Sequence, residues 1–152
     1  MKVIHKSYKF KIAPDNEQKE LLAKHFGACR FVFNRYLNIR KETYLEEKKS
    51  LNYYDNANDL TVLKKDEQFV WLKEINSQSL QSSLRNLDTA YNKFFRKQTK
   101  FPRFKSKVDK QSFTIPQSVS IEDGKLQIPK FKKGIEINIH REIKGKVLFA
   151  TI

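Results

Sequence analysis

The sequence predicts an α+β fold in which a block of helices is inserted into a small sheet. Residues 3–12 alternate in the strand period, residues 77–96 have the spacing of an amphipathic helix, and strand-like alternation returns after Lys97. A lone first strand has no local partner, so it most simply joins the later strands. We therefore expect residues 1–13 to pair with the C-terminal part of the chain, around the helices.

The first strand and the first helix are separated by a clear boundary. Pro14 ends the strand predicted over residues 3–12, and Asp15 with Gln18 forms a variant capping box that opens a helix. Apolar residues then recur at a spacing of three and four, which is typical of a helix with one buried face. We expect this core stripe to contain Leu22, Phe26, Cys29, Phe33, Tyr36 and Leu37.

Gly27 interrupts the same helix. A glycine inside a helix costs about 1 kcal/mol relative to alanine, so its presence needs a structural reason. We interpret Gly27 as a place where another backbone packs closely against the helix.

Two further helices are predicted before the period changes. A short helix is expected over residues 56–65, after a polar stretch. The stronger prediction covers residues 77–96, where Asn76 or Ser77 can cap the helix. The core stripe of this helix consists of Leu80, Leu84, Leu87 and Tyr91.

The rest of the chain is predicted to form short strands. Asp123-Gly124 is a strong hairpin signal, and Ile135, Ile137 and Ile139 alternate with polar residues, which indicates one buried and one wet face. Because the sequence stops inside a strand pattern, we expect it to be the front part of a longer protein. The other expected strands are residues 112–116, 119–121, 125–128 and 146–152.

The composition favours a nucleic-acid partner. Lys and Arg total 31 against 17 Asp and Glu, which gives a net charge of +14. In an aromatic-rich chain this imbalance indicates a polyanion, and no helix has the Trp/Leu and Lys faces of a membrane-surface helix. The single Cys29, the lack of a signal peptide and the lack of a long apolar run fit a cytoplasmic location.

Residues 93–110 are the richest candidate segment. They combine eight Lys and Arg with one acid and four phenylalanines. The cations can neutralise phosphates while the rings anchor the segment or stack on bases. Arg30, Arg35, Arg40 and Lys41 lie off the core stripe and either contact phosphates or serve solubility. The phosphate or RNA contacts predicted from the basic segment are Lys93, Arg96, Lys97, Arg103, Lys105 and Lys107.

The outer face of the helix over residues 77–96 carries amides and arginines but no carboxylate. Asn and Gln pair with adenine and Arg pairs with guanine in the major groove, where a helix fits. We predict base contacts by Gln78, Gln81 and Arg85. The alternative is an ordinary solvated face, although such faces usually carry Glu–Lys pairs.

No catalytic or metal site is predicted. The acidic pairs at residues 46–47, 66–67 and 122–123 have no convergent partners that would hold a divalent cation. One cysteine and three scattered histidines do not assemble a zinc site at the usual spacing, and no Gly-rich phosphate loop is present. We expect neither a cofactor nor cleavage in this chain alone.

Several segments resemble the N-terminal part of the TnpB family, the OrfB-type proteins encoded by bacterial and archaeal insertion sequences. They occur in the same order, and the similarity continues through residues 112–114, 126–130 and 145–147, so it covers essentially the whole chain. The similar segments are GACRFVFNRYL (27–37), WLKEI (71–75), SLQSSLRNLDTAYNKFF (79–95) and FPRFKSK (101–107).

TnpB proteins are RNA-guided DNA endonucleases. The resemblance implies a wedge β-barrel from residues 1–13 and 100–152, and a recognition domain, long described as a helix-turn-helix, over residues 14–99. It implies a guide RNA from the transposon end and double-stranded DNA as partners. The nuclease domain with its divalent metal, and the zinc of the C-terminal part, would follow residue 152. Positions that the resemblance assigns to motif reading are Tyr53, Ala57, Ser77, Gln81 and Thr114.

A second hypothesis stays open. The helical block would then be a stand-alone helix-turn-helix regulator that binds a specific duplex without RNA. In either case we expect a bacterial or archaeal protein that is a monomer or a weak dimer.

Overall fold

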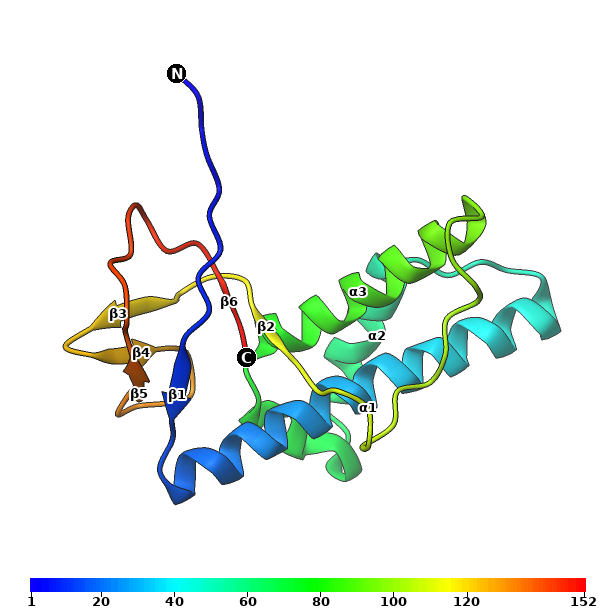
Figure 1. Ribbon diagram of the computed structural model, residues 1–152. Coiled ribbons are helices and arrows are strands. Elements are labelled where there is room, and N and C mark those ends of the chain that lie inside the picture. The colour runs from blue at the N-terminus through cyan, green and yellow to red at the C-terminus, as the bar shows by residue number, and fades with distance from the viewer.

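The computed structural model describes residues 1–152 and confirms the α+β class, with helices beside two small antiparallel sheets (Figure 1). None of its helices combines the length and the apolar composition that crossing a membrane requires. The helices are α1 (Asn16–Glu47), α2 (Tyr53–Leu63), the 3₁₀ segment η1 (Glu67–Glu74) and α3 (Ser77–Phe95). The strands are β1 (Lys11–Ala13), β2 (Thr114–Ile115), β3 (Ser120–Glu122), β4 (Lys125–Gln127), β5 (Ile135–Asn138) and β6 (Ala150–Thr151).

Two reciprocal caps set where α1 and α2 begin. The backbone N–H of Gln18 donates to Asp15 Oδ1 at 2.8 Å and that of Asp15 donates to Gln18 Oε1 at 3.0 Å, which confirms the predicted capping box. Asn52 and Asp55 form the same pair at 3.0 and 2.9 Å. Because Asn52 caps it, α2 begins three residues earlier than predicted, at Tyr53.

The core runs between α1 and α3 and continues into the sheets. Most of the predicted stripe of α1 is buried, including Leu22, Cys29 and Tyr36, and Phe26 packs partly buried against it. His25 joins the layers, because its ring lies 5.1 Å from that of Phe113 and 5.3 Å from that of Phe131. The predicted stripe of α3 is fully confirmed as buried: Leu80, Leu84, Leu87 and Tyr91.

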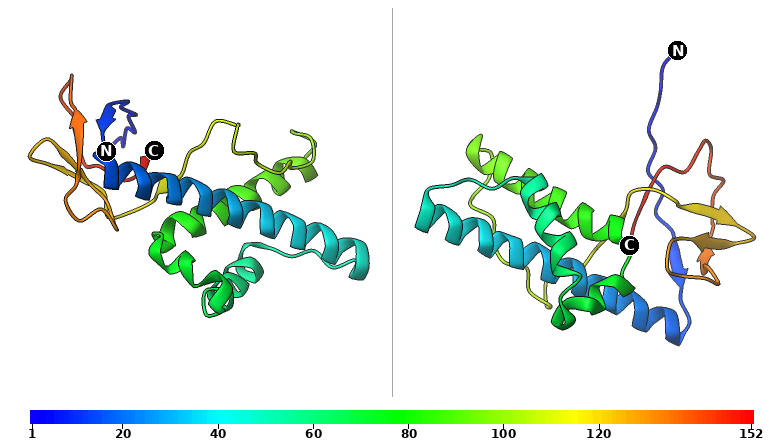
Figure 2. Two further views of the ribbon diagram at one scale, coloured as in Figure 1. Left: turned by 90° about the horizontal axis from the view of Figure 1, so that it is seen from below. Right: turned by 180° about the vertical axis from the view of Figure 1, so that it is seen from behind.

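The larger sheet has the strand order β1-β5-β4-β3 and lies at one end of α1 (Figures 1 and 2). Ile12 stands opposite Ile137, so the prediction that the first strand joins the later sheet is confirmed. The predicted hairpin joins β3 to β4 through Asp123 and Gly124, both with positive φ. β2 pairs only with β6.

The extent of the strands was overpredicted. Of residues 3–12 only the last two lie in β1, and the chain before them continues past the sheet (Figure 1). There the side chains of Tyr8 and Phe10 contact residues 140–144, but the backbone pairing with β5 does not continue. Of residues 146–152 only Ala150–Thr151 form a strand. The strands form two separate sheets and no closed barrel.

Candidate nucleic-acid interface

The basic segment 93–110 returns from the far end of α3 along α1 toward the sheet (Figure 1). Asn34 holds it in the manner of a β ladder: its Nδ2 donates to the carbonyl of Lys105 at 2.8 Å, and its Oδ1 accepts from the N–H of Lys105 at 2.7 Å. Arg30 Nη1 donates to Gln111 Oε1 at 2.6 Å. Side chains of α1 therefore fix the course of an otherwise irregular segment.

Beside this segment, an open groove of about 550 Å³ lies on α1. We call it the Gly27 groove. No carboxylate lines it, and the ion pairs of the chain join Lys24 to Glu74 and Arg40 to Asp88, so the arginines of the groove are not neutralised. Its lining residues are Gly27, Arg30, Phe31, Asn34 and Arg35.

The interpretation that Gly27 admits a neighbouring backbone is wrong. A Cβ placed on Gly27 would meet only the Nη2 atom of Arg30, at 3.8 Å. The glycine instead leaves the groove without a side chain at this position, which allows an external backbone to approach the helix.

Aromatic rings hold one side of the groove in place. Phe31 stacks on Phe69 with centroids 5.7 Å apart and lies 5.5 Å from Trp71. The guanidinium of Arg35 lies over the Phe69 ring at 5.0 Å, and its buried Nε has no hydrogen-bond partner. Arg35 is thus oriented by an aromatic face rather than by an acid, which leaves its charge available to a phosphate.

The predicted base-reading face of α3, which we call the α3 ridge, is not packed inside the molecule. Gln78 and Gln81 are half-buried and Arg85 is exposed. The guanidinium of Arg85 lies 4.2 Å from the ring centroid of Tyr53, so α2 and α3 bring these two predicted residues together.

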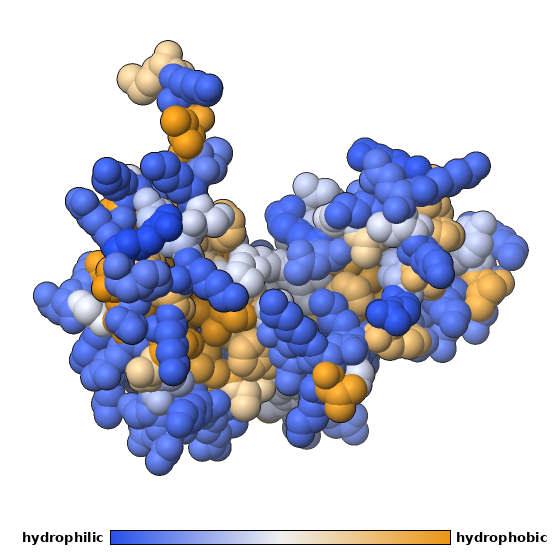
Figure 3. All heavy atoms as spheres, viewed as in Figure 1, coloured by the Kyte–Doolittle hydropathy of each residue, from blue (hydrophilic) through white to orange (hydrophobic).

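The remaining motif positions lie on elements next to the ridge. Ser77 is exposed at the first turn of α3, Ala57 is half-buried on α2, and Thr114 is half-buried on β2, which contacts α3. The Oγ1 atom of Thr114 lies 3.1 Å from that of Thr151. The surface is mostly hydrophilic and is hollowed above β2 and the start of α3 (Figure 3).

The predicted phosphate contacts fall into two groups. Arg30 and Arg35 line the Gly27 groove. The backbone of Lys105 is bonded to Asn34, which also lines the groove, and the Lys105 Nζ lies 4.7 Å from the Phe33 ring centroid. Lys93 lies in the last turn of α3, at the far end of the molecule, and is exposed. The structure therefore does not gather all predicted cations at one place. The exposed remainder is Arg96, Lys97, Arg103 and Lys107.

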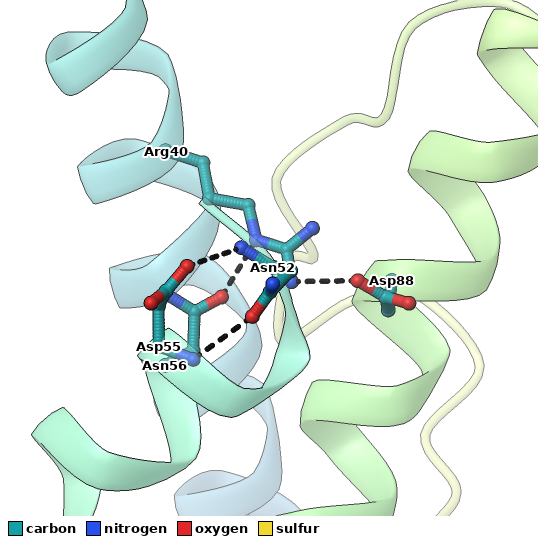
Figure 4. A network of polar contacts seen from close by, with 5 residues as sticks. All are labelled: Arg40, Asn52, Asp55, Asn56 and Asp88. Atoms are coloured by element: carbon teal, nitrogen blue, oxygen red, sulfur yellow. Dashed lines mark hydrogen bonds and ion pairs between the residues drawn. The ribbon is translucent and has the colours of Figure 1, made fainter. Parts of the chain in front are cut away.

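Arg40 neither contacts phosphates nor serves solubility, which were the two roles predicted for it. It is buried, its Nε donates to Asn56 Oδ1 at 2.6 Å, and its Nη2 pairs with Asp88 Oδ1 at 3.0 Å (Figure 4). A charge placed where three helices meet must be paired, since burial without partners is costly. Arg40 therefore stabilises the junction of α1, α2 and α3.

Two buried side chains of reactive types, the imidazole of His25 and the thiol of Cys29, also serve the fold. His25 donates from Nδ1 to the Leu21 carbonyl at 2.9 Å and accepts at Nε2 from the Asn76 N–H at 3.3 Å, and burial lowers the pKa of its ring. Burial raises the pKa of the Cys29 thiol to about 12. No group of three or more His, Cys, Asp or Glu residues is placed to hold a metal ion.

Sequence reasoning missed Asn34, Gln111 and the ring pair Phe31–Phe69. Asn34 lies within a segment of family resemblance, but its partner is 71 residues away and has no local signal. The excess of aromatic residues indicated ring clusters without indicating which rings would meet.

Comparison with known proteins identifies the family. The sequence profile of the OrfB/IS605-type helix-turn-helix domain matches residues 1–49. In this structure those residues contain β1 and the single long helix α1 rather than two helices joined by a turn.

Three relatives extend the comparison. The "Virulence protein VsdF" of Salmonella dublin is 36% identical over 105 residues, covering 63% of this chain and 88% of that protein. The "Putative RNA-guided DNA endonuclease InsQ" of Escherichia coli K12 is 38% identical over 148 residues, covering 96% of this chain and 37% of that protein. A "Putative RNA-guided DNA endonuclease" of Streptomyces pristinaespiralis is 32% identical over 145 residues, covering 94% and 36%. The chain spans little more than a third of these last two relatives, and it belongs to the OrfB/TnpB family of insertion-sequence proteins, whose N-terminal part it matches.

Proposed function

We propose that this chain is the nucleic-acid-binding N-terminal region of an RNA-guided DNA endonuclease. It would hold a guide RNA and read a short motif in duplex DNA beside the target. The observation that carries the proposal is the α3 ridge, where Gln78, Gln81 and Arg85 reach the surface and Arg85 forms no ion pair within the chain. Amides and guanidinium groups on a helix match the hydrogen-bonding edges of the major groove.

Positioning and base reading divide between two surfaces. The Gly27 groove and the basic segment supply positive charge that is not paired within the chain, and such contacts fix a nucleic acid without reading its sequence. The α3 ridge, with Ser77 and Thr114 beside it, reads the bases, while the buried ring of Tyr53 lies against Arg85. Residues 1–13 and 100–152 act as the wedge and residues 14–99 as the recognition unit. Cleavage, with its divalent metal and zinc, belongs to the remainder of the full-length protein.

Substitution of Gln81 by alanine tests base reading. Against a panel of duplexes with different flanking motifs, Gln81→Ala should lose about 1–3 kcal/mol of discrimination, since one bidentate base contact is removed. The matched control is Lys107→Ala, which should weaken binding to all duplexes about equally and reduce the salt slope by about one. A uniform loss with Gln81→Ala would show that the residue does not read bases.

The role of RNA is tested separately. Gel shifts of the duplex panel, with and without the transcript of the transposon end, should show motif-specific binding only when RNA is present. Equal specificity without RNA would instead identify a stand-alone helix-turn-helix regulator.

A further inference from the structure

A second cavity, distinct from the Gly27 groove and the α3 ridge, lies where the ends of α1 and α3 meet the start of the basic segment. Its volume is about 460 Å³, within the range of about 300–1,000 Å³ that small-molecule sites occupy. We call it the aromatic cavity. The rings that line it are Tyr44, Tyr91, Phe94, Phe95 and Phe101.

The rings form a connected wall that the chain leaves uncovered. Phe101 meets Tyr91 and Phe94 edge to face, with centroids 5.6 and 5.3 Å apart, and Tyr91 stacks on Phe95 at 6.1 Å. Nevertheless, Phe95 is 66% exposed and Tyr44 52% exposed. Core formation does not explain these rings, because a ring that served only the core would be covered.

The charges around the cavity select the kind of occupant. Its only charged lining residues are Arg40 and Lys41, and no carboxylate lines it. Arg40 is already paired with Asp88, so Lys41 supplies the free charge at the wall, and exposed Lys93 and Lys97 flank Phe94 and Phe95 in sequence. An apolar wall with a cationic rim fits a flat ring carried on an anionic backbone.

We infer that the aromatic cavity accepts an unstacked base of single-stranded RNA. The base lies against Phe95 and Phe101, while the adjoining phosphates meet Lys41 and the basic segment. Single-stranded RNA is recognised in this way, by bases splayed out onto aromatic side chains. A second copy of this chain is disfavoured as occupant, because each copy carries a net charge of +14. The inference rests on the proposed function, which supplies the RNA.

Tyr91 adds a polar feature to this wall. Its hydroxyl is buried and has no hydrogen-bond partner within the chain. Burial raises the pKa of Tyr91, so the group stays a neutral donor at physiological pH. Buried polar groups are normally paired, and this donor lacks a partner that the chain itself supplies.

The test measures binding of a fluorescein-labelled oligouridine 12-mer to the 152-residue chain by anisotropy over a range of salt concentrations. Phe95→Ala should weaken binding between about fivefold and about 150-fold, the effect of losing one stacked base, with an unchanged salt slope. Phe95→Trp should keep the affinity. The matched control, Phe149→Ala, removes a ring that is 61% exposed and lies outside the cavity, and it should bind like the unmodified chain.

The outcomes separate this inference from the proposed function. Equal affinities for Phe95→Ala and the unmodified chain overturn the cavity assignment while leaving nucleic-acid binding intact. The unmodified chain could instead self-associate with rising concentration. If Phe95→Ala abolished that association and left RNA binding unchanged, the cavity would be a protein-docking surface, and the cavity assignment would again be overturned. Tighter binding of oligodeoxyuridine than of oligouridine overturns the assignment to RNA. If the unmodified chain binds no nucleic acid at low salt, the proposed function itself fails.

Discussion

The arginines of α1 occupy two contrasting regions of the molecule. Arg40 is buried at the junction of three helices and is bonded to Asn56 and Asp88, whereas Arg30 and Arg35 line the open Gly27 groove without an acidic partner. The same residue type on the same helix thus stabilises the fold in one place and is available to a ligand in the other. What separates the two roles is the carboxylate, and the sequence alone does not show which arginine will meet one.

The largest expected effect is the loss of stability when the buried Arg40 is replaced. Arg40→Ala should lower the free energy of unfolding by about 3 kcal/mol, because Asp88 and the buried Asn56 lose their partner. Urea denaturation measures this loss. Arg35→Ala, the matched variant in the groove, should change stability by less than about 1 kcal/mol and instead weaken nucleic-acid binding. If Arg35→Ala lowered stability more than Arg40→Ala did, or if Arg40→Ala weakened binding more, the two arginines would not have the separate roles described above.

A second test uses the pH dependence of another buried polar group. The pKa of His25 is lowered below its ordinary value of 6.5, mainly by burial, and protonation would set an N–H against the Asn76 N–H. The unfolded chain therefore binds the proton more readily, and stability should fall as the pH drops below about 6.5. The slope reaches at most about 1.4 kcal/mol per pH unit.

Thermal unfolding between pH 5 and 8 provides the measurement for His25. The His25→Gln variant should remove this part of the slope, while His5→Gln, at an exposed position, should keep it. An identical slope in His25→Gln would show that another group causes the pH dependence.

The smallest expected effect is a gain in stability from a substitution in the Gly27 groove, whereas Arg40→Ala lowers stability. Gly27→Ala should raise stability by up to about 1 kcal/mol, because alanine favours the helix and the added Cβ meets only Arg30 Nη2 at 3.8 Å. If a phosphate backbone lies on the helix here, the same variant should bind nucleic acid more weakly. Stabilisation without any loss of affinity would place the ligand elsewhere.

Local signals predicted much of the fold. The capping box at Asp15, the core stripe of α3 and the hairpin at Asp123-Gly124 each depend on residues close in sequence, and all three are confirmed. Strand lengths were wrong because they depend on the partner: β1 is only as long as its pairing with β5.

The candidate sites were predicted less completely than the fold. Periodicity placed Gln81 and Arg85 on the surface of α3, as the structure has them. It did not separate Arg40 from Arg35, because the partners of Arg40 lie 16 and 48 residues away. The reason for Gly27 was also misjudged, since the open space beside a helix depends on where distant segments run.

Because α1 is one continuous helix from Asn16 to Glu47, it has a consequence for anything bound along it. Arg30 at the Gly27 groove and Tyr44 at the aromatic cavity lie on this one helix, and the helical rise separates them by about 21 Å. A single strand that occupied both places would have to bridge this distance. The length of α1 between the Gly27 groove and the aromatic cavity would then set the length of strand that fits, and inserting one helical turn between them would change that length.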